Sequence, residues 1–270
     1  MKKFKIAVCQ IHTTDNKSEN IKHSIDMIET ASKEHPQIIV LPEMFNCPYE
    51  NKYFPQFAEE YSGETTTSIS KIAKKLNTYI VAGSIPEYEN EKIYNTCYVF
   101  DRNGELIGKH RKAHLFDIDV KDKIYFKESD TLTAGDNVTV IDTDLGKIGI
   151  AICYDIRFPE LSRKMALEGA KIIILPAAFN MTTGPAHWEL SIRMRALDNQ
   201  VFFVGAAPAR DENSSYVAFG NSRIADPWGK IIAQADEKEC IMYGEIDMNL
   251  LDKIREELPL LKHRRPSLYK

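Results

Sequence analysis

A cysteine, Cys153, lies where an apolar segment, residues 147–152, ends in the polar turn formed by residues 154–160. A thiol at the end of a buried strand and just before a helix is held rigidly at the mouth of a site. Helical N–H groups and Arg157 beside it favour the thiolate, which is the nucleophilic form of cysteine. Most free cysteines, however, are small buried apolar residues. Position alone therefore favours burial, and the case for a nucleophile depends on partner groups.

A carboxylate, Glu43, follows another apolar segment, residues 37–41, and Pro42. Loss of hydration at such a strand end raises the pKa of a carboxyl group and makes it a usable acid and base near neutral pH. A solvated loop glutamate is the alternative, and it is slightly favoured when Glu43 is considered alone. Glu43 is nevertheless the better candidate for a base acting on Cys153.

The basic segment 108–116 supplies a candidate for charge stabilisation. Lys109 and Arg111 are expected on a solvated face. Lys112 has the opposite phase to Arg111, so it can project into a cleft and offer its ammonium group to an oxyanion. The spacing of Glu128, farther along the chain, favours a structural role over a catalytic one.

Histidine is the usual base for a cysteine, but no histidine in this sequence stands out by its spacing. His110 and His114 are four residues apart, which on a helix suggests a metal pair. They follow a predicted hairpin strand, so that helix is doubtful. His187 begins a predicted helix and is equally suited to be a cap, a wall or a ligand. The five cysteines are odd in number and form no CxxC pair, so we expect no zinc or thioredoxin-like site.

The elements that would position these groups occur twice in the same order, as short apolar strands alternating with amphipathic helices. In the first series we predict strand 5–10, helix 19–34, strand 37–41, helix 66–76, strand 79–84 and a hairpin of 95–101 with 106–110. In the second we predict strand 147–152, helix 159–168, strand 171–175, helix 187–197, strand 201–206 and a hairpin of 221–226 with 230–235. Near-continuous apolar strands imply sheets covered on both faces. The predicted fold is therefore α/β, a four-layer α-β-β-α sandwich of two similar β-α-β-α-β-hairpin halves.

The two halves differ where chemistry would take place. Glu43 follows the first Leu-Pro pair, whereas Ala177 follows the second. Cys153 leads into a polar turn that its counterpart Cys9 lacks. Ligands of α/β sheets bind in crevices at the strand ends. We therefore expect a site that takes Glu43 from one half and Cys153 from the other.

The bulk composition is that of an ordinary globular protein. The chain has 270 residues, 43% hydrophobic and 27% charged, with a net charge of −4, which does not suggest binding to nucleic acid or to a membrane surface. A basic run, residues 262–265, is expected to be a solvated or subunit-bridging tail. The N-terminus has no apolar signal stretch and no segment approaches a membrane span. These features predict a soluble, cytoplasmic protein with reduced thiols.

Three blocks of the sequence resemble the signature blocks of the nitrilase, or carbon–nitrogen hydrolase, superfamily: residues 41–43, 110–116 and 152–160. Within this superfamily the chain is most similar to the omega-amidase branch. The segments that carry the second resemblance are 45–49, 52–55, 114–120, 179–190 and 198–201. The likeness extends over almost the whole chain, and no departure is seen at the catalytic positions.

The resemblance implies the α-β-β-α fold and a metal-free, cofactor-free amidase that acts on 2-oxoglutaramate and 2-oxosuccinamate. It implies Cys153 as nucleophile, Glu43 as general base and acid, Lys112 as oxyanion donor and Glu128 as the glutamate that orders Lys112 or the attacking water. The implied domain covers residues 4–248. Residues 249–270 would form a C-terminal helix and a tail that reaches over the partner in a homodimer.

In the mechanism that follows from these roles, the backbone N–H of Tyr154 is a second oxyanion donor. Arg157 is expected to bind the substrate carboxylate as a bidentate pair, the alternative being a salt bridge within its own turn to Glu160. Tyr49 and Thr183 are expected to be hydrogen-bonding walls of the site. Phe116 is expected to be a hydrophobic wall.

Three other functions remain open at the level of the sequence. The same chemistry could serve deaminated glutathione, N-carbamoyl compounds or simple aliphatic amides. A Cys–His peptidase would need His187 or His114 as its base. A binding or regulatory module without catalysis is disfavoured by the intact set of Glu43, Lys112 and Cys153.

Overall fold

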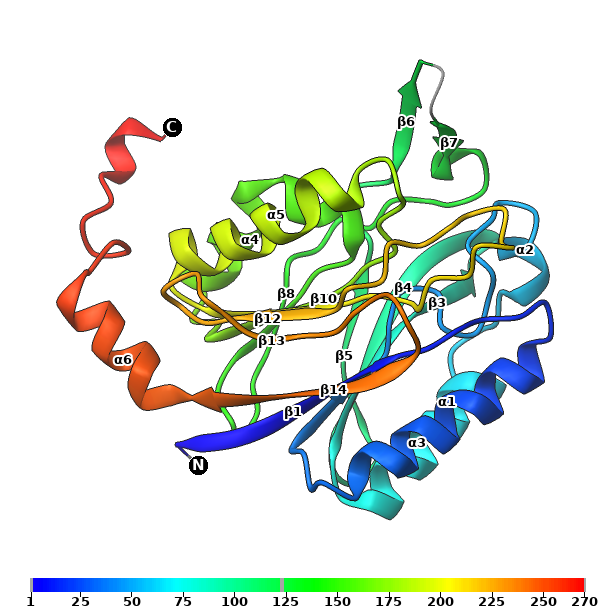
Figure 1. Cartoon of the computed structure of the whole chain (residues 1–270), viewed down its shortest axis with the longest axis horizontal. Coiled ribbons are helices and arrows are strands. Elements are labelled where there is room, and N and C mark those ends of the chain that lie inside the picture. The colour runs from blue at the N-terminus through cyan, green and yellow to red at the C-terminus, as the bar shows by residue number, and fades with distance from the viewer. Residues whose placement is uncertain (1, 122–123, 270) are drawn as a thin grey trace.

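The computed structural model describes residues 2–121 and 124–269, and its core consists of two six-stranded sheets packed face to face (Figure 1). The strands of the first sheet, in spatial order, are β14 (Cys240–Asp247), β1 (Lys3–Gln10), β2 (Ile38–Val40), β3 (Tyr79–Glu89), β4 (Lys92–Phe100) and β5 (Leu106–Arg111). Those of the second are β13 (Ile231–Gln234), β12 (Arg223–Ala225), β11 (Phe202–Ala206), β10 (Ile172–Pro176), β9 (Ile148–Ile150) and β8 (Thr139–Ile141). In each sheet three parallel strands are flanked by antiparallel ones.

Helices cover the outer face of each sheet, so the predicted four-layer α-β-β-α order is confirmed (Figure 1). The helices are α1 (Lys17–Ser32), α2 (Phe54–Phe57), α3 (Glu64–Leu76), α4 (Pro159–Leu167), α5 (Gly184–Asn199) and α6 (Met248–Glu257). Helices α1 and α3 lie on the first sheet, and α4 and α5 lie on the second. A small hairpin, β6 (Asp117–Val120) with β7 (Ile124–Lys127), projects from the sandwich.

Strand β1 shows how the sequence produces these layers. Its side chains alternate between the two faces of the sheet. Ile6 and Val8 pack into the core between the sheets, whereas Ala7 and Cys9 pack beneath α1 and α3. Because both faces are buried, the strand is apolar at every position from 6 to 9 and does not alternate with polar residues.

The structure extends the predicted series at several points. Strand β3 continues to Glu89, well past the predicted end at residue 84. Helix α5 begins at Gly184 and not at His187, because Pro185 is well suited to the first turn of a helix. Strands β8 and β14 and the β6–β7 hairpin were not predicted. Strand β14 pairs antiparallel with β1, so the C-terminal part of the domain completes the sheet that the N-terminus begins.

Within the described ranges, no helix has the length and the apolar character needed to cross a membrane.

Candidate active site

The candidate nucleophile occupies a strained turn directly after β9. Cys153 opens the short 3₁₀ helix η2 (Cys153–Arg157) and has a φ of +44°, in the left-handed region that residues with a Cβ rarely adopt. Such a conformation costs about 1–3 kcal/mol and is typical of functional sites. The side chain is only 4% exposed. The sequence correctly placed Cys153 at a strand end before a helical turn.

A buried carboxylate that the sequence did not single out, Asp155, holds this turn together. It accepts hydrogen bonds from the Ile152 N–H at 3.0 Å and from the His114 N–H at 2.9 Å. His110 Nε2 lies 3.1 Å and His114 Nδ1 lies 2.7 Å from the same carboxylate. Burial by itself would raise the pKa of Asp155, but these hydrogen bonds outweigh it and hold the pKa below the usual range. The two histidines thus support the turn that contains Cys153. His110 does so from β5, and His114 from the loop after β5.

Close to Cys153, three charged side chains form a buried cluster. Lys112 Nζ lies 3.0 Å from Glu43 Oε1 and 2.9 Å from the Glu128 carboxylate. All three side chains are fully buried. Two carboxylates around one ammonium leave the cluster with a net negative charge when all are ionised. The structure therefore brings together the residues that the sequence placed far apart in the chain.

Glu43 is held by donors from both halves of the molecule. Asn95, on β4, donates to its Oε1 at 2.8 Å, and the backbone N–H of Ala178 donates to its Oε2 at 2.7 Å. Ala178 follows β10, the strand that corresponds to the one before Glu43. Neither donor was predicted from the sequence. The Leu-Pro repeat could have suggested the second, because it places residues 42 and 176 at equivalent strand ends.

Lys112 enters the interior because it has the opposite strand phase to Arg111, as predicted. Lys109 and Arg111, which were expected on a solvated face, are only partly exposed. Lys109 Nζ and Arg111 Nε each lie 2.7 Å from the buried carboxylate of Glu87. Burial would raise the pKa of Glu87, but the hydrogen bonds from these two cations lower it to about 2.

The pKa values of the cluster follow from burial and charge. Burial raises the pKa of Glu43, although the Lys112 ammonium partly opposes this shift. Burial would lower the pKa of Lys112, but the charges of Glu128 and Glu43 reverse the effect and raise it. Lys112 is therefore a permanent cation, and Glu43 is a carboxylate whose proton affinity is increased, as the sequence predicted.

The predicted thiolate at Cys153 is not supported by its surroundings. Burial, followed by the negative charge of Glu43, raises the pKa of the thiol well above its usual value. Lys112 opposes this shift without reversing it. The resting form is thus the neutral thiol, and a nucleophilic attack requires a base that removes its proton. Glu43 is the carboxylate whose charge acts most strongly on it.

Tyr49 and Phe116 both contact Glu128. The Tyr49 hydroxyl donates to Glu128 Oε1 at 2.6 Å, and the Phe116 N–H donates to Oε2 at 2.6 Å. Tyr49, which was expected as a wall of the substrate site, does not line the cavity that contains Cys153, but it lines a neighbouring cavity that contains Glu43. Its hydroxyl instead orders Glu128 and lies 3.3 Å from Lys112 Nζ.

A small cavity, called here the Cys153 cavity, opens over the thiol. Four residues predicted for the site line it together with Cys153, and Ala178, Phe179 and Tyr216 complete its wall; the four are Phe116, Tyr154, Arg157 and Thr183. The N–H of Tyr154 has no hydrogen-bond acceptor within residues 2–121 and 124–269, so it is available to a ligand. The Thr183 hydroxyl donates to Asn180 Oδ1 at 3.2 Å, and its oxygen can accept a hydrogen bond from a ligand.

Arg157 lines the Cys153 cavity and is itself partly exposed. It forms no ion pair with a carboxylate in the described part of the chain, so the alternative salt bridge to Glu160 is absent there. Its guanidinium lies 5.1 Å from the Phe179 ring centroid and 5.6 Å from that of Tyr154. Arg157 Nη1 donates to His187 Nδ1 at 3.2 Å. His187, in the first turn of α5, therefore lies next to Arg157.

Comparison with known proteins agrees with this geometry. The family model described as "Carbon-nitrogen hydrolase" matches residues 5–256. Omega-amidase NIT2 of Xenopus tropicalis is 49% identical and that of Homo sapiens is 46% identical, each over 100% of this chain and 98% of the relative. The crystal structure of Saccharomyces cerevisiae Nit3, a member of branch 10 of the nitrilase superfamily, is 42% identical. It superimposes with a TM-score of 0.90 over 98% of this chain and 97% of its own. The chain therefore belongs to the carbon–nitrogen hydrolase family of the nitrilase superfamily.

Proposed function

We propose that this protein is an omega-amidase, which hydrolyses the terminal amide of 2-oxoglutaramate and 2-oxosuccinamate to the acid and ammonia. The full-length similarity to omega-amidases supports this activity. The single observation that carries the substrate class is Arg157, a cation without a carboxylate partner in the described ranges, in the same cavity as Cys153. An amide whose far end bears a carboxylate would satisfy this cation.

In the proposed acylation step, the Glu43 carboxylate takes the proton of the Cys153 thiol as the sulfur attacks the amide carbonyl. The Lys112 ammonium and the Tyr154 N–H stabilise the oxyanion, and each such donor contributes roughly 3–4 kcal/mol in a dry site. The C–N bond then breaks, and the proton held by Glu43 passes to the departing nitrogen. Ammonia and a thioester on Cys153 result.

In the proposed deacylation step, Glu43 takes a proton from a water molecule that attacks the thioester carbonyl. The same two donors stabilise the second oxyanion. When this intermediate collapses, the C–S bond breaks and the sulfur recovers its proton from Glu43. Glu128 serves both steps by holding Lys112 in position, since its own carboxylate is fixed by Tyr49 and Phe116.

Ammonia release from a panel of amides tests this function. The panel contains 2-oxoglutaramate, glutamine, an N-carbamoyl amino acid, deaminated glutathione and butyramide. We expect the highest kcat/KM with 2-oxoglutaramate, and no turnover in Cys153→Ala or Glu43→Gln. We expect Arg157→Met to lose about 1.5–3 kcal/mol of binding to a carboxylate, roughly 10–150-fold in kcat/KM, with butyramide unaffected. Retained turnover in either catalytic variant would exclude the mechanism, and unchanged selectivity in Arg157→Met would exclude its role.

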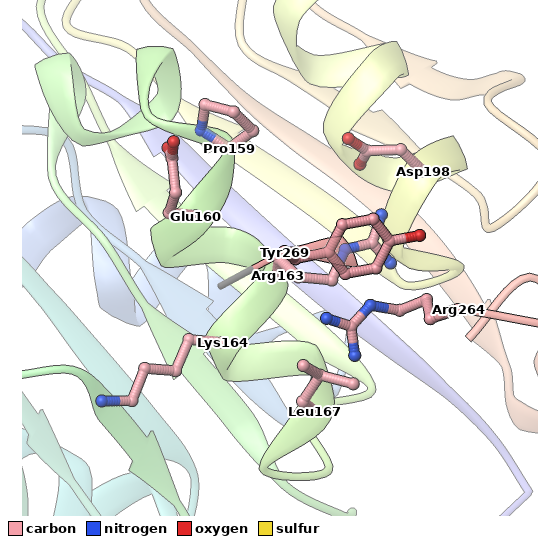
Figure 2. Close-up of a pocket in the computed structure, with 8 residues that line it drawn as sticks. All are labelled: Pro159, Glu160, Arg163, Lys164, Leu167, Asp198, Arg264 and Tyr269. Atoms are coloured by element: carbon pink, nitrogen blue, oxygen red, sulfur yellow. The ribbon is translucent and has the colours of Figure 1, made fainter. Parts of the chain in front are cut away.

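We also propose that the enzyme is a homodimer whose C-terminal tail contacts the second copy. Helices α4 and α5 expose the apolar side chains of Leu167, Leu190 and Met194. Next to them, the tail residues Arg264 and Tyr269 border a broad cavity against Arg163 of α4 and Asp198 of α5 (Figure 2). The tail leaves the sandwich after α6 (Figure 1). Near its end, Tyr269 is 60% exposed. An exposed apolar helix face beside an extended tail fits an interface between copies.

Light scattering after size exclusion tests the dimer. We expect a dimer for the full chain and a monomer for the double variant Leu190→Glu, Met194→Glu. Removal of residues 258–270 is expected to weaken the dimer. The control is Tyr125→Glu, at an exposed aromatic residue on the β6–β7 hairpin. A monomeric full chain would refute the proposal.

We also propose that the enzyme lies in the cytoplasm, because its five free cysteines fit a reducing compartment.

A further inference from the structure

A second cavity, called here the Glu43 cavity, approaches the proposed catalytic centre from another side. It is lined by Glu43 together with His12, Ala209, Asp211 and Ser214, and Cys153 is not among its lining residues. The two cavities share two wall residues, Ala178 and Tyr216. The nucleophile and the proposed base therefore line different cavities.

The Glu43 cavity runs from the surface to the interior. His12, Asp211 and Ser214 are partly exposed, whereas Ala209 and Glu43 are buried, with Glu43 only 2% exposed. The volume that a water-sized sphere can occupy in it is about 50 Å³. A cavity needs roughly 10–15 Å³ of this volume to hold one water molecule. The cavity thus has room for water or ammonia. The polar side chains at its mouth can form hydrogen bonds with either molecule.

The wall between the two cavities is fixed by hydrogen bonds. The Tyr216 hydroxyl donates to the Ala178 carbonyl oxygen at 2.5 Å, and its ring packs against Tyr49 with 4.6 Å between centroids. On the same residue, the Ala178 N–H donates to Glu43 at 2.7 Å. Glu43 is thus bound to a residue of the wall that the two cavities share. There it can exchange protons with the Cys153 thiol on one side and with ammonia or water on the other.

The mouths of the two cavities carry opposite charges. Arg157 borders the Cys153 cavity and Asp211 borders the Glu43 cavity, and neither forms an ion pair with another described residue. An anionic amide is attracted by the first mouth and repelled by the second. Ammonia, and the ammonium ion it forms in water, meets no such repulsion at Asp211. The charges therefore separate the anionic substrate from the nitrogen product.

We propose that the Glu43 cavity is a separate passage, through which ammonia leaves and the hydrolytic water arrives while the acyl group is held on Cys153. This inference rests on the proposed amidase activity. Ammonia formed when Glu43 protonates the leaving nitrogen departs on the Glu43 side. A water molecule then enters by the same route, gives its proton to Glu43 and attacks the thioester.

Narrowing the passage at Ser214 tests the proposal. In Ser214→Leu, and in the more flexible Ser214→Met, we expect steady-state turnover of 2-oxoglutaramate to fall roughly tenfold. We expect the acyl-enzyme on Cys153, trapped by acid and detected by mass spectrometry, to accumulate. Asn213→Leu is the matched control, because it adds a similar side chain to an exposed neighbour that lines neither cavity.

The rate at which iodoacetamide alkylates Cys153 separates the two routes. This reagent should enter through the Cys153 cavity, so we expect Ser214→Leu to leave its rate unchanged. If alkylation slows as much as turnover, the Glu43 cavity is the substrate entrance and the proposal is overturned. It is also overturned if both Ser214 variants, folded as judged by their Tm, match Asn213→Leu in turnover without acyl-enzyme. If the wild-type protein releases no ammonia from any amide, the proposed function fails instead.

Discussion

Replacement of Lys112 by methionine tests the buried charge cluster directly. Methionine has nearly the length of lysine but no charge, so Glu43 and Glu128 lose the ammonium that lies 3.0 and 2.9 Å from them. Breaking a buried ion pair by removing one partner costs about 3–5 kcal/mol, because the other charge remains in the interior. In a chain of this size that corresponds to a Tm lower by roughly 6–20 °C. Turnover should fall by at least ~100-fold, because an oxyanion donor is lost.

The loss of stability in Lys112→Met should depend on pH, with a sign set by Glu43. Burial raises the pKa of Glu43 above its unfolded value, and Lys112 opposes that shift. Without Lys112 the pKa rises further, so the folded variant binds a proton that the unfolded chain releases. The variant therefore becomes relatively more stable as the pH falls from 8 toward the unfolded pKa of about 4.3.

Thermal unfolding of Lys112→Met between pH 5 and 8 measures both effects. The matched control is Lys92→Met, which removes an exposed lysine from the neighbouring part of the same sheet and should change stability by less than about 0.5 kcal/mol. If the two variants unfold within a degree or two of each other at pH 8, Lys112 does not neutralise buried carboxylates. A Tm difference that grows as the pH falls would contradict the sign of the argument.

Asp155→Asn should cost about 1–3 kcal/mol at pH 7. Because the folded-state pKa of Asp155 lies below its unfolded value, the stability from its ionised form is present above about pH 4 and is lost as the pH falls toward the folded-state pKa. The difference in unfolding free energy between the two proteins should therefore be smaller at about pH 2.5 than at pH 7. In Glu43→Gln, iodoacetamide should alkylate Cys153 with a lower midpoint pH than in the wild type, because the charge of Glu43 raises the thiol pKa; an unchanged or higher midpoint would contradict this. Gly83→Ala should lower both Tm and ammonia release. Gly83 has a φ of +26°, and an added Cβ would lie 1.9 Å from the carbonyl oxygen of Pro42, the residue before Glu43. Wild-type values of Tm and ammonia release would refute this steric argument.

The order of elements was readable from the sequence wherever burial is continuous. Strands such as β2 and β10 are apolar throughout because a helix covers one face and a sheet covers the other. Strand β14 was missed because Gly244, on its buried face, carries no apolar side chain, and because its partner β1 lies at the other end of the chain. The end of β3 was missed because Glu87 looks like a loop residue in the sequence. It is accommodated in the strand by Lys109 and Arg111 from β5.

Part of the candidate site was also readable from the sequence, because its chemistry depends on residue type and strand phase. Glu43 and Cys153 follow apolar strands, and Lys112 alternates with Arg111. Their catalytic roles stay predictions until the variants are measured. The roles of Tyr49 and Asp155 could not be read in this way. Each depends on partners distant in the chain: Glu128 is 79 residues from Tyr49, and His110 is 45 residues from Asp155.

The sequence by itself determined which side chains are present, at which strand ends they lie and which family they belong to. The tertiary structure alone decided their protonation. Cys153 looks like a thiolate beside Arg157 in the sequence, but in the fold it is a neutral thiol, because burial and the charge of Glu43 outweigh the cations nearby. The tertiary structure also decided that Glu43 and Cys153 line separate cavities. Both results depend on desolvation and on contacts such as that between Glu43 and Ala178, 135 residues apart, which no local pattern contains.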